Sequence, residues 1–128
     1  MTARLAPSIA ALLLTAALAG CAGVGTPPPV LVEIHDGEAA GGFEPSTITV
    51  PAGTEVRWSN AGSRRHGVTT EPLDAAQEPI VPAGAEGWES GVISPGETFS
   101  LRLDMAGTYV YRCSIHGEIV GVIQVEEQ

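Results

Sequence analysis

The stretch from residue 107 to residue 125 constrains the fold of this chain more than any other. Its sequence is GTYVYRCSIHGEIVGVIQV, in which aromatic and β-branched residues stand on both sides of a short, glycine-containing segment. Such a pattern predicts two strands joined by a tight loop. Cys113 and His116 lie in that loop. A thiolate and an imidazole held by two strands can face one metal ion, and a soft sulfur with nitrogen partners suits copper or zinc.

One cysteine and one histidine are too few ligands for a metal site, so a further ligand must come from upstream. The candidate is His66, in the segment RRHGVTT. His35 lies on the outward set of an alternating segment, and we expect it to be a solvated surface residue. Arg64 and Arg65 form the paired positive charge of an acidic chain. They are either a docking point for an acidic redox partner or simple solvated loop charge.

At these residues the chain resembles a cupredoxin, a small blue-copper protein of the plastocyanin/amicyanin type. The resemblance covers roughly residues 30–128 and rests on an ordered set of segments: GFEP at 42–45, ITVPAG at 48–53, VRWSN at 56–60, HGVT at 66–69, SPGETF at 94–99, GTYVYRC at 107–113 and the stretch 116–125. It implies that His66, Cys113 and His116 bind one type 1 copper ion. It also implies that His116 is the ligand near the surface, where electrons enter and leave.

The sequence departs from this family at the fourth copper position. The family usually places a methionine three residues after the histidine in the amicyanin type, or five residues after it in the plastocyanin type. Those positions hold Ile119 and Gly121 here, and the amicyanin-like spacing fits the closing strand better. An isoleucine cannot bind a metal, so we expect a three-coordinate site with an apolar cap and a raised reduction potential. Glu118 is the alternative fourth ligand.

The strand pattern and the resemblance predict an all-β fold, an antiparallel Greek-key β-sandwich of about seven or eight short strands. Trp58 is expected in the core, and residues 71–87 are expected to form a long loop. Besides the two strands around the ligand loop, strands are predicted at residues 30–35, 43–50, 55–58, 66–70 and 98–103.

The first 29 residues read as a targeting segment and a linker. Residues 1–20 carry one charge and an apolar run too short to span a bilayer, which is typical of a signal peptide. The run ends in LAGC, which looks like a bacterial lipobox with Cys21 as the lipidated residue. Residues 21–29 form a Gly/Pro linker, and 30–128 the copper-binding domain. We therefore expect an exported protein, lipid-anchored to the cell envelope and facing the periplasm or the outside, without a disulfide.

The charge balance narrows the functional classes. The chain has 6 basic and 15 acidic residues, a net charge of −9, which argues against nucleic acid as a partner. We expect a monomer that exchanges electrons with redox partner proteins, of which no motif identifies the donor or the acceptor. Three histidines leave no ligands for a second copper, so we expect no enzyme. The alternative is a copper-binding or chaperone-type cupredoxin without an electron-carrier role.

Overall fold

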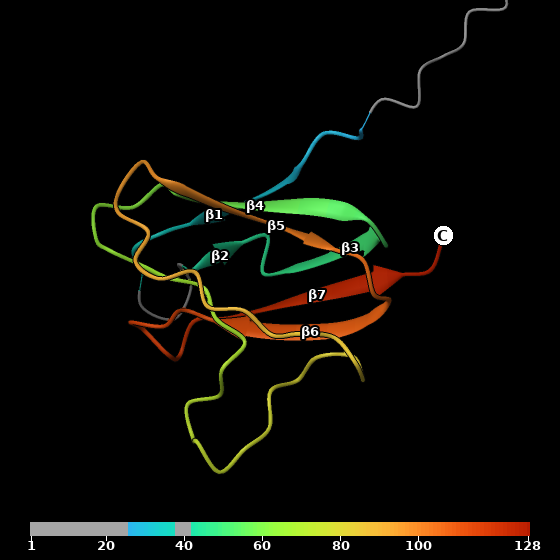
Figure 1. The fold of residues 1–128 in the computed structure, drawn as a ribbon. Helices are drawn as coiled ribbons and strands as arrows, with labels where there is room; N and C mark the ends of the chain where they lie inside the picture. Colours follow the sequence, from blue (N-terminus) through green and yellow to red (C-terminus); the bar gives the residue numbers. More distant parts are fainter. Residues whose placement is uncertain (1–25, 38–41) are drawn as a thin grey trace, which may run out of the picture.

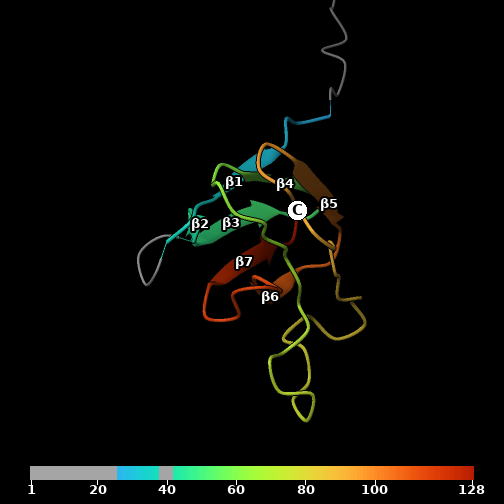
Figure 2. The same cartoon turned by 90° about the vertical axis from the view of Figure 1, so that its left-hand side faces the viewer.

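A computed structural model describes residues 26–37 and 42–128 as two packed β-sheets (Figure 1). The strands are β1 (Val30–Ile34), β2 (Phe43–Glu44), β3 (Thr47–Pro51), β4 (Thr54–Asn60), β5 (Thr98–Leu103), β6 (Gly107–Arg112) and β7 (Val120–Glu126). One sheet has the order β2-β1-β4-β5 and the other β3-β7-β6. Figure 2 shows β1, β4 and β5 on one side of the molecule and β6 and β7 on the other. The predicted all-β sandwich is confirmed.

The sheets are mixed, where the sequence led us to expect antiparallel pairing. β1 runs parallel to β4, with Ile34 opposite Asn60, and β3 runs parallel to β7. The pairs β1–β2, β4–β5 and β6–β7 are antiparallel. Because parallel strands end at the same edge of a sheet, the segments that follow β1 and β4 leave side by side. The backbone N–H of Ala61 donates to the carbonyl of Ile34 at 2.9 Å, which ties the two segments together.

Two predicted strands differ in the structure. The strand expected over residues 43–50 is divided into β2 and β3, which belong to different sheets. The division falls at Pro45, because proline has no N–H to offer a sheet ladder. Residues 66–70 form isolated bridges to Ile93, Glu89 and Arg112 and no continuous strand. The predicted loop over residues 71–87 is present, and it projects from the sandwich beside β6 (Figure 1).

Trp58 lies at the centre of the core, as predicted, with 0% of its surface exposed. Its ring packs against Tyr111, Trp88 and Phe99, with centroids 5.4–5.8 Å apart. The rest of the core comes from alternate positions of the strands, which point to one face of a sheet. Buried members from β1 and β7 are Val32, Ile34, Ile123 and Val125. Burying each such side chain contributes about 1.5–3 kcal/mol to folding.

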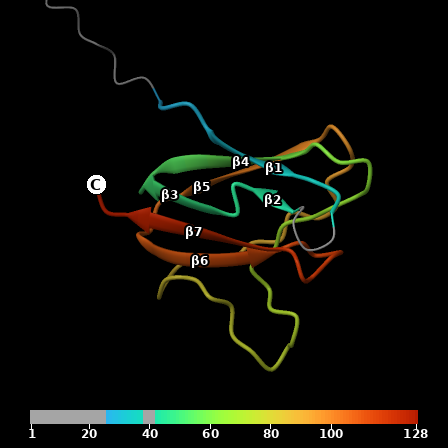
Figure 3. The ribbon, with the colours of Figure 1, turned by 180° about the vertical axis from the view of Figure 1, so that it is seen from behind.

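The two ends of the sandwich carry different parts of the chain. Residues 26–29, which lead into β1, and the C-terminus lie at one end, as the view from behind shows (Figure 3). The loops that follow β4 and β6 lie at the other end, and β1 leads toward it. The predicted signal peptide at 1–20 and Cys21 fall outside the described residues. Within the described ranges, no helix is long and apolar enough to cross a membrane.

Candidate metal centre

Cys113 continues the inward-facing positions of β6. Successive residues of a strand point to opposite faces, so Tyr109, Tyr111 and Cys113 share one face. All three are buried, and Cys113 is completely so. Cys113 is a free thiol in the described chain. The strand pattern therefore directs the sulfur into the interior at the edge of the core.

The loop after β6 folds back on itself and brings His116 to this sulfur. The N–H of Cys113 donates to the carbonyl of Ile119 at 2.9 Å, and the N–H of Ile119 donates to the carbonyl of His116 at 3.0 Å. The N–H of His116 also points at Cys113 Sγ, 3.4 Å away. Nδ1 of His116 lies 3.7 Å from the same sulfur. The ring is half-buried, so one side of it remains near solvent.

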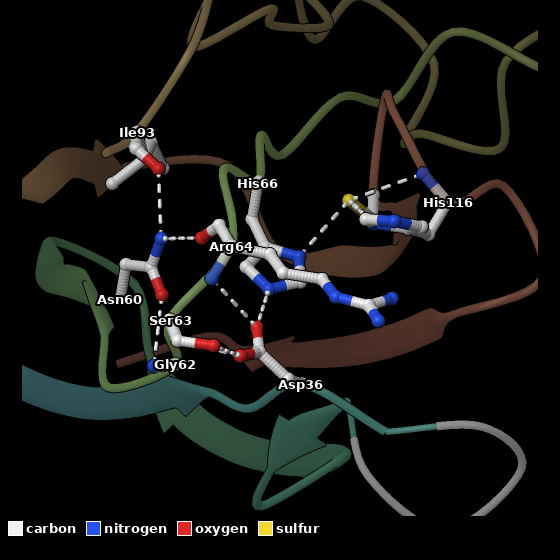
Figure 4. Close-up of polar contacts among 9 residues, drawn as sticks. Asp36, Asn60, Gly62, Ser63, Arg64, His66, Ile93 and His116 are labelled. Carbon is white, nitrogen blue, oxygen red and sulfur yellow. Dashed lines mark hydrogen bonds and ion pairs between the residues drawn. The ribbon is translucent and has the colours of Figure 1, made fainter. Parts of the chain in front are cut away.

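His66 reaches the sulfur from the segment after β4. Its backbone N–H and carbonyl both bond to Ile93, at 3.1 and 2.7 Å, and its side chain is 1% exposed. Nδ1 of His66 lies 3.6 Å from Cys113 Sγ. Asn60 shapes this segment through its side-chain amide (Figure 4). The amide NH₂ donates to the carbonyls of Arg64 and Ile93, and its oxygen accepts from the N–H of Gly62.

The structure brings together the three candidate ligands named from the sequence. The donor atoms of His66, Cys113 and His116 all lie within 4.8 Å of one another. One thiol and two imidazole nitrogens, in a buried place, are a donor set that fits copper. The carboxylate of Glu118 is not part of this group. His35 lies at the surface instead, with Nε2 at 3.0 Å from Glu33.

The two candidate axial positions differ in their surroundings. Ile119 lines the same cavity as His66 and His116, and it is partly buried against the core. Gly121 lies in β7 and faces Tyr111, so that a Cβ placed there would come within 2.2 Å of the Tyr111 ring. A side chain at residue 121 has no room. Of the two family spacings from the histidine to the axial position, three residues or five, this packing favours the three-residue spacing, which places Ile119 at that position.

Sequence reasoning did not identify Asp36 as part of the site. Its carboxylate accepts bonds from the N–H and hydroxyl of Ser63 and from the N–H of Arg64. Its Oδ1 lies 2.7 Å from Nε2 of His66 (Figure 4). The hydrogen bonds from Ser63, and then that with His66, hold the pKa of Asp36 well below its ordinary value. Asp36 follows β1 and meets His66 through the parallel pairing of β1 with β4, which the alternation of residues along the sequence does not reveal.

A β-sandwich in which one thiol and two imidazoles meet at one end defines a cupredoxin. The family model of copper binding proteins, plastocyanin/azurin family, matches residues 30–126, and the chain belongs to that family. Copper is therefore its cofactor.

Plastocyanin of Scenedesmus fuscus is 37% identical over 78 residues, covering 58% of this chain and 74% of that protein. Chloroplastic plastocyanin of Pisum sativum is 35% identical over 112 residues, covering 83% of this chain and 62% of that protein. Among solved structures, a purple cupredoxin from Nitrosopumilus maritimus superposes with a TM-score of 0.61 and 27% identity, covering 76% of this chain and 99% of that one. A copper-containing nitrite reductase from Thermus scotoductus gives a TM-score of 0.61 and 25% identity, but this chain covers 23% of it.

Proposed function

We propose that this protein is an electron carrier whose single type 1 copper is held by His66, Cys113 and His116. The observation that carries the proposal is the convergence of one thiol and two ring nitrogens within 4.8 Å. When bound, copper supplies a one-electron change between Cu(II) and Cu(I). The chain holds each donor on a different support, so the fold itself fixes the three donors relative to one another. Cys113 is held at the end of β6, and His66 by its two backbone hydrogen bonds to Ile93. His116 is held by the ligand loop, residues 113–119, which the hydrogen bond from Cys113 N–H to the Ile119 carbonyl closes.

The proposal places Ile119 at the axial position, without a fourth protein ligand. It is supported by the lack of room at Gly121. Ile119 and Glu118 both line the cavity of the two histidines, but the Glu118 carboxylate lies outside the cluster of donor atoms. An apolar axial neighbour donates no electrons to the metal. An axial donor such as a thioether would stabilise Cu(II) more than Cu(I), so the absence of this donor favours the reduced ion and raises the reduction potential.

We assign electron exchange to the surface at His116. The neighbouring Ile115 is 48% exposed, and the exposed Leu73 from the long loop packs against Gly117. A redox partner protein would meet His116 across these apolar residues. The proposal contains no catalytic step in this chain. The sequence has three histidines, and with His35 bonded to Glu33 at the surface none is left for a second copper site.

The proposal also includes export and lipid anchoring through Cys21, with residues 1–20 removed. Its support is the apolar leader and the LAGC segment. The test is membrane fractionation of the expressed protein beside a Cys21→Ala variant. Anchoring predicts that the wild type is found with membranes and the variant is soluble; equal distribution of the two would contradict it.

The missing methionine favours a second candidate, a copper-binding or chaperone-type protein that holds Cu(I) without cycling. Visible absorption separates the two. We expect the copper-loaded mature protein to show a strong band at about 600 nm, to lose it with ascorbate, and to regain it on reoxidation. Tight, colourless Cu(I) binding that cannot be reoxidised would favour the second candidate.

Two variants assign the band to the site. Cys113→Ser should abolish it, because the colour arises from the thiolate–copper bond. His35→Gln is the matched control, since it removes an imidazole outside the cluster and should leave the band unchanged. A band that survives Cys113→Ser would contradict the site.

A further inference from the structure

Asp36 connects the segment after β1 to the buried histidine of the metal centre (Figure 4). Nδ1 of His66 lies 3.6 Å from Cys113 Sγ, and Nε2 of the same ring lies 2.7 Å from Oδ1 of Asp36. A neutral imidazole carries its proton on one nitrogen and a lone pair on the other. An ionised carboxylate can only accept, so the proton belongs on Nε2. The lone pair of Nδ1 then faces the sulfur, in the direction where a metal ligand is needed.

The Asp36 carboxylate is itself fixed. Oδ2 accepts from both the N–H and the hydroxyl of Ser63, and Oδ1 accepts from the N–H of Arg64 as well as contacting His66. All of these partners lie in the segment that follows β4 and ends at His66. The carboxylate is therefore held by the same segment whose histidine it orients.

We infer that Asp36 is a positioning residue of the copper site, which holds His66 with its proton on Nε2 and lowers the reduction potential. The first half of this inference concerns the chain alone, and the second half rests on the proposed function. A carboxylate bonded to the far nitrogen raises the basicity of the ligating nitrogen, as it does in carboxylate–histidine–metal arrangements. A more basic ligand stabilises Cu(II) more than Cu(I). Asp36 thus opposes the effect of the apolar Ile119.

A purely structural role for Asp36 makes a different prediction. In that case its bonds to Ser63 and Arg64 would shape the loop, and the bond to His66 would be incidental. Removing the charge would then weaken the fold and leave the potential where it was. The potential and the position of the ring proton therefore decide between the two roles.

The test compares Asp36→Asn with Glu33→Gln. Both changes remove one carboxylate that contacts a histidine, but Glu33 contacts His35 at the surface. Asp36→Asn should lower the ratio of Cu(II) to Cu(I) affinity about tenfold, which corresponds to a rise of about 59 mV for a one-electron couple. Glu33→Gln should leave the potential unchanged. Equal potentials in wild type and Asp36→Asn would overturn the effect on copper.

A second measurement needs no copper and no variant. ¹⁵N NMR of the metal-free wild type at about pH 8, above the ordinary pKa of an imidazole, reports which ring nitrogen carries the proton. We expect the proton of His66 on Nε2, and a proton on Nδ1 would overturn the positioning role even if Asp36→Asn does not fold. Absence of the visible copper band in the wild type would instead contradict the proposed function, so the two failures are distinguishable.

Discussion

The backbone N–H of Cys113 donates a hydrogen bond to the carbonyl oxygen of Ile119, with 2.9 Å between nitrogen and oxygen. The bond closes the ligand loop and fixes where residue 119 stands. Since the bond uses only backbone atoms, a different side chain at residue 119 leaves it intact. The side chain lines the cavity of His66 and His116, so its chemistry is expected to reach the metal.

Ile119→Met tests the axial position. A thioether placed there stabilises Cu(II) relative to Cu(I), so the reduction potential should fall, on the order of 59 mV for a tenfold change in their affinity ratio. Voltammetry of the copper-loaded protein measures it. Ile115→Met is the control, because Ile115 is exposed on the same loop and does not line that cavity. An equal or higher potential in Ile119→Met would rule out the three-coordinate site.

Glu118→Gln tests the other candidate for the fourth ligand. The carboxylate lies outside the group of converging donor atoms. We expect the visible spectrum to stay the same and copper affinity to change less than twofold, roughly the effect of an exposed charge. A loss of affinity of about tenfold or more, the scale expected for a group that supports a metal, would make Glu118 a ligand. Copper titration monitored at the visible band gives the answer.

Gly121→Ala should destabilise the protein without touching a ligand. A Cβ at residue 121 would lie 2.2 Å from Cζ of Tyr111, and that ring is held by Phe43 and Trp58. Overfilling a packed core costs about 1–3 kcal/mol. Denaturant unfolding of the metal-free protein measures the loss. Val120→Ala, at an exposed position of the same strand, should change the unfolding free energy by about 0.5 kcal/mol or less. Similar values for the two variants would contradict the packing described here.

Tyr111 predicts how stability depends on alkaline pH. Burial raises the pKa of Tyr111 to about 12 from its ordinary value of 10.0. Between these two pH values the folded state keeps a proton that the unfolded state loses. The contribution of Tyr111 to the free energy of unfolding is therefore complete below pH 10 and disappears as the pH rises to about 12. The difference between the two pKa values corresponds to a loss of roughly 2–3 kcal/mol in the free energy of unfolding.

Tyr111→Phe isolates this effect. Between pH 10 and 12 the wild type should lose more unfolding free energy than the variant, and its ultraviolet absorbance should show a late tyrosine step that the variant lacks, beside that of Tyr109. The sequence has two tyrosines, and burial and the charge of Asp104 raise the pKa of Tyr109 as well, so the assignment to Tyr111 rests on the difference between the two proteins. Parallel losses of stability in both proteins would refute the prediction.

The sequence was informative where the structure depends on local alternation. The pattern around Cys113 and His116 predicted two strands and a loop, and the alternation of Val32 and Ile34 predicted a buried face; both are present. Periodicity does not say which strands become neighbours. The parallel pairing of β1 with β4 was therefore not foreseen. Asp36 and His66 are 30 residues apart and meet only through that pairing, which is why this contact was missed.

The end of the sandwich at which the chain enters has a practical consequence. β1 begins at the end opposite the loop between β6 and β7, to which His116 belongs, and runs toward that loop (Figure 3). A surface that held the protein by the residues before Val30 would be separated from His116 by the length of the strands, about 20 Å. Attached to an electrode in this way, the domain would present its histidine to the solution and shield it from the support. The same molecule attached by a residue of the ligand loop would do the opposite.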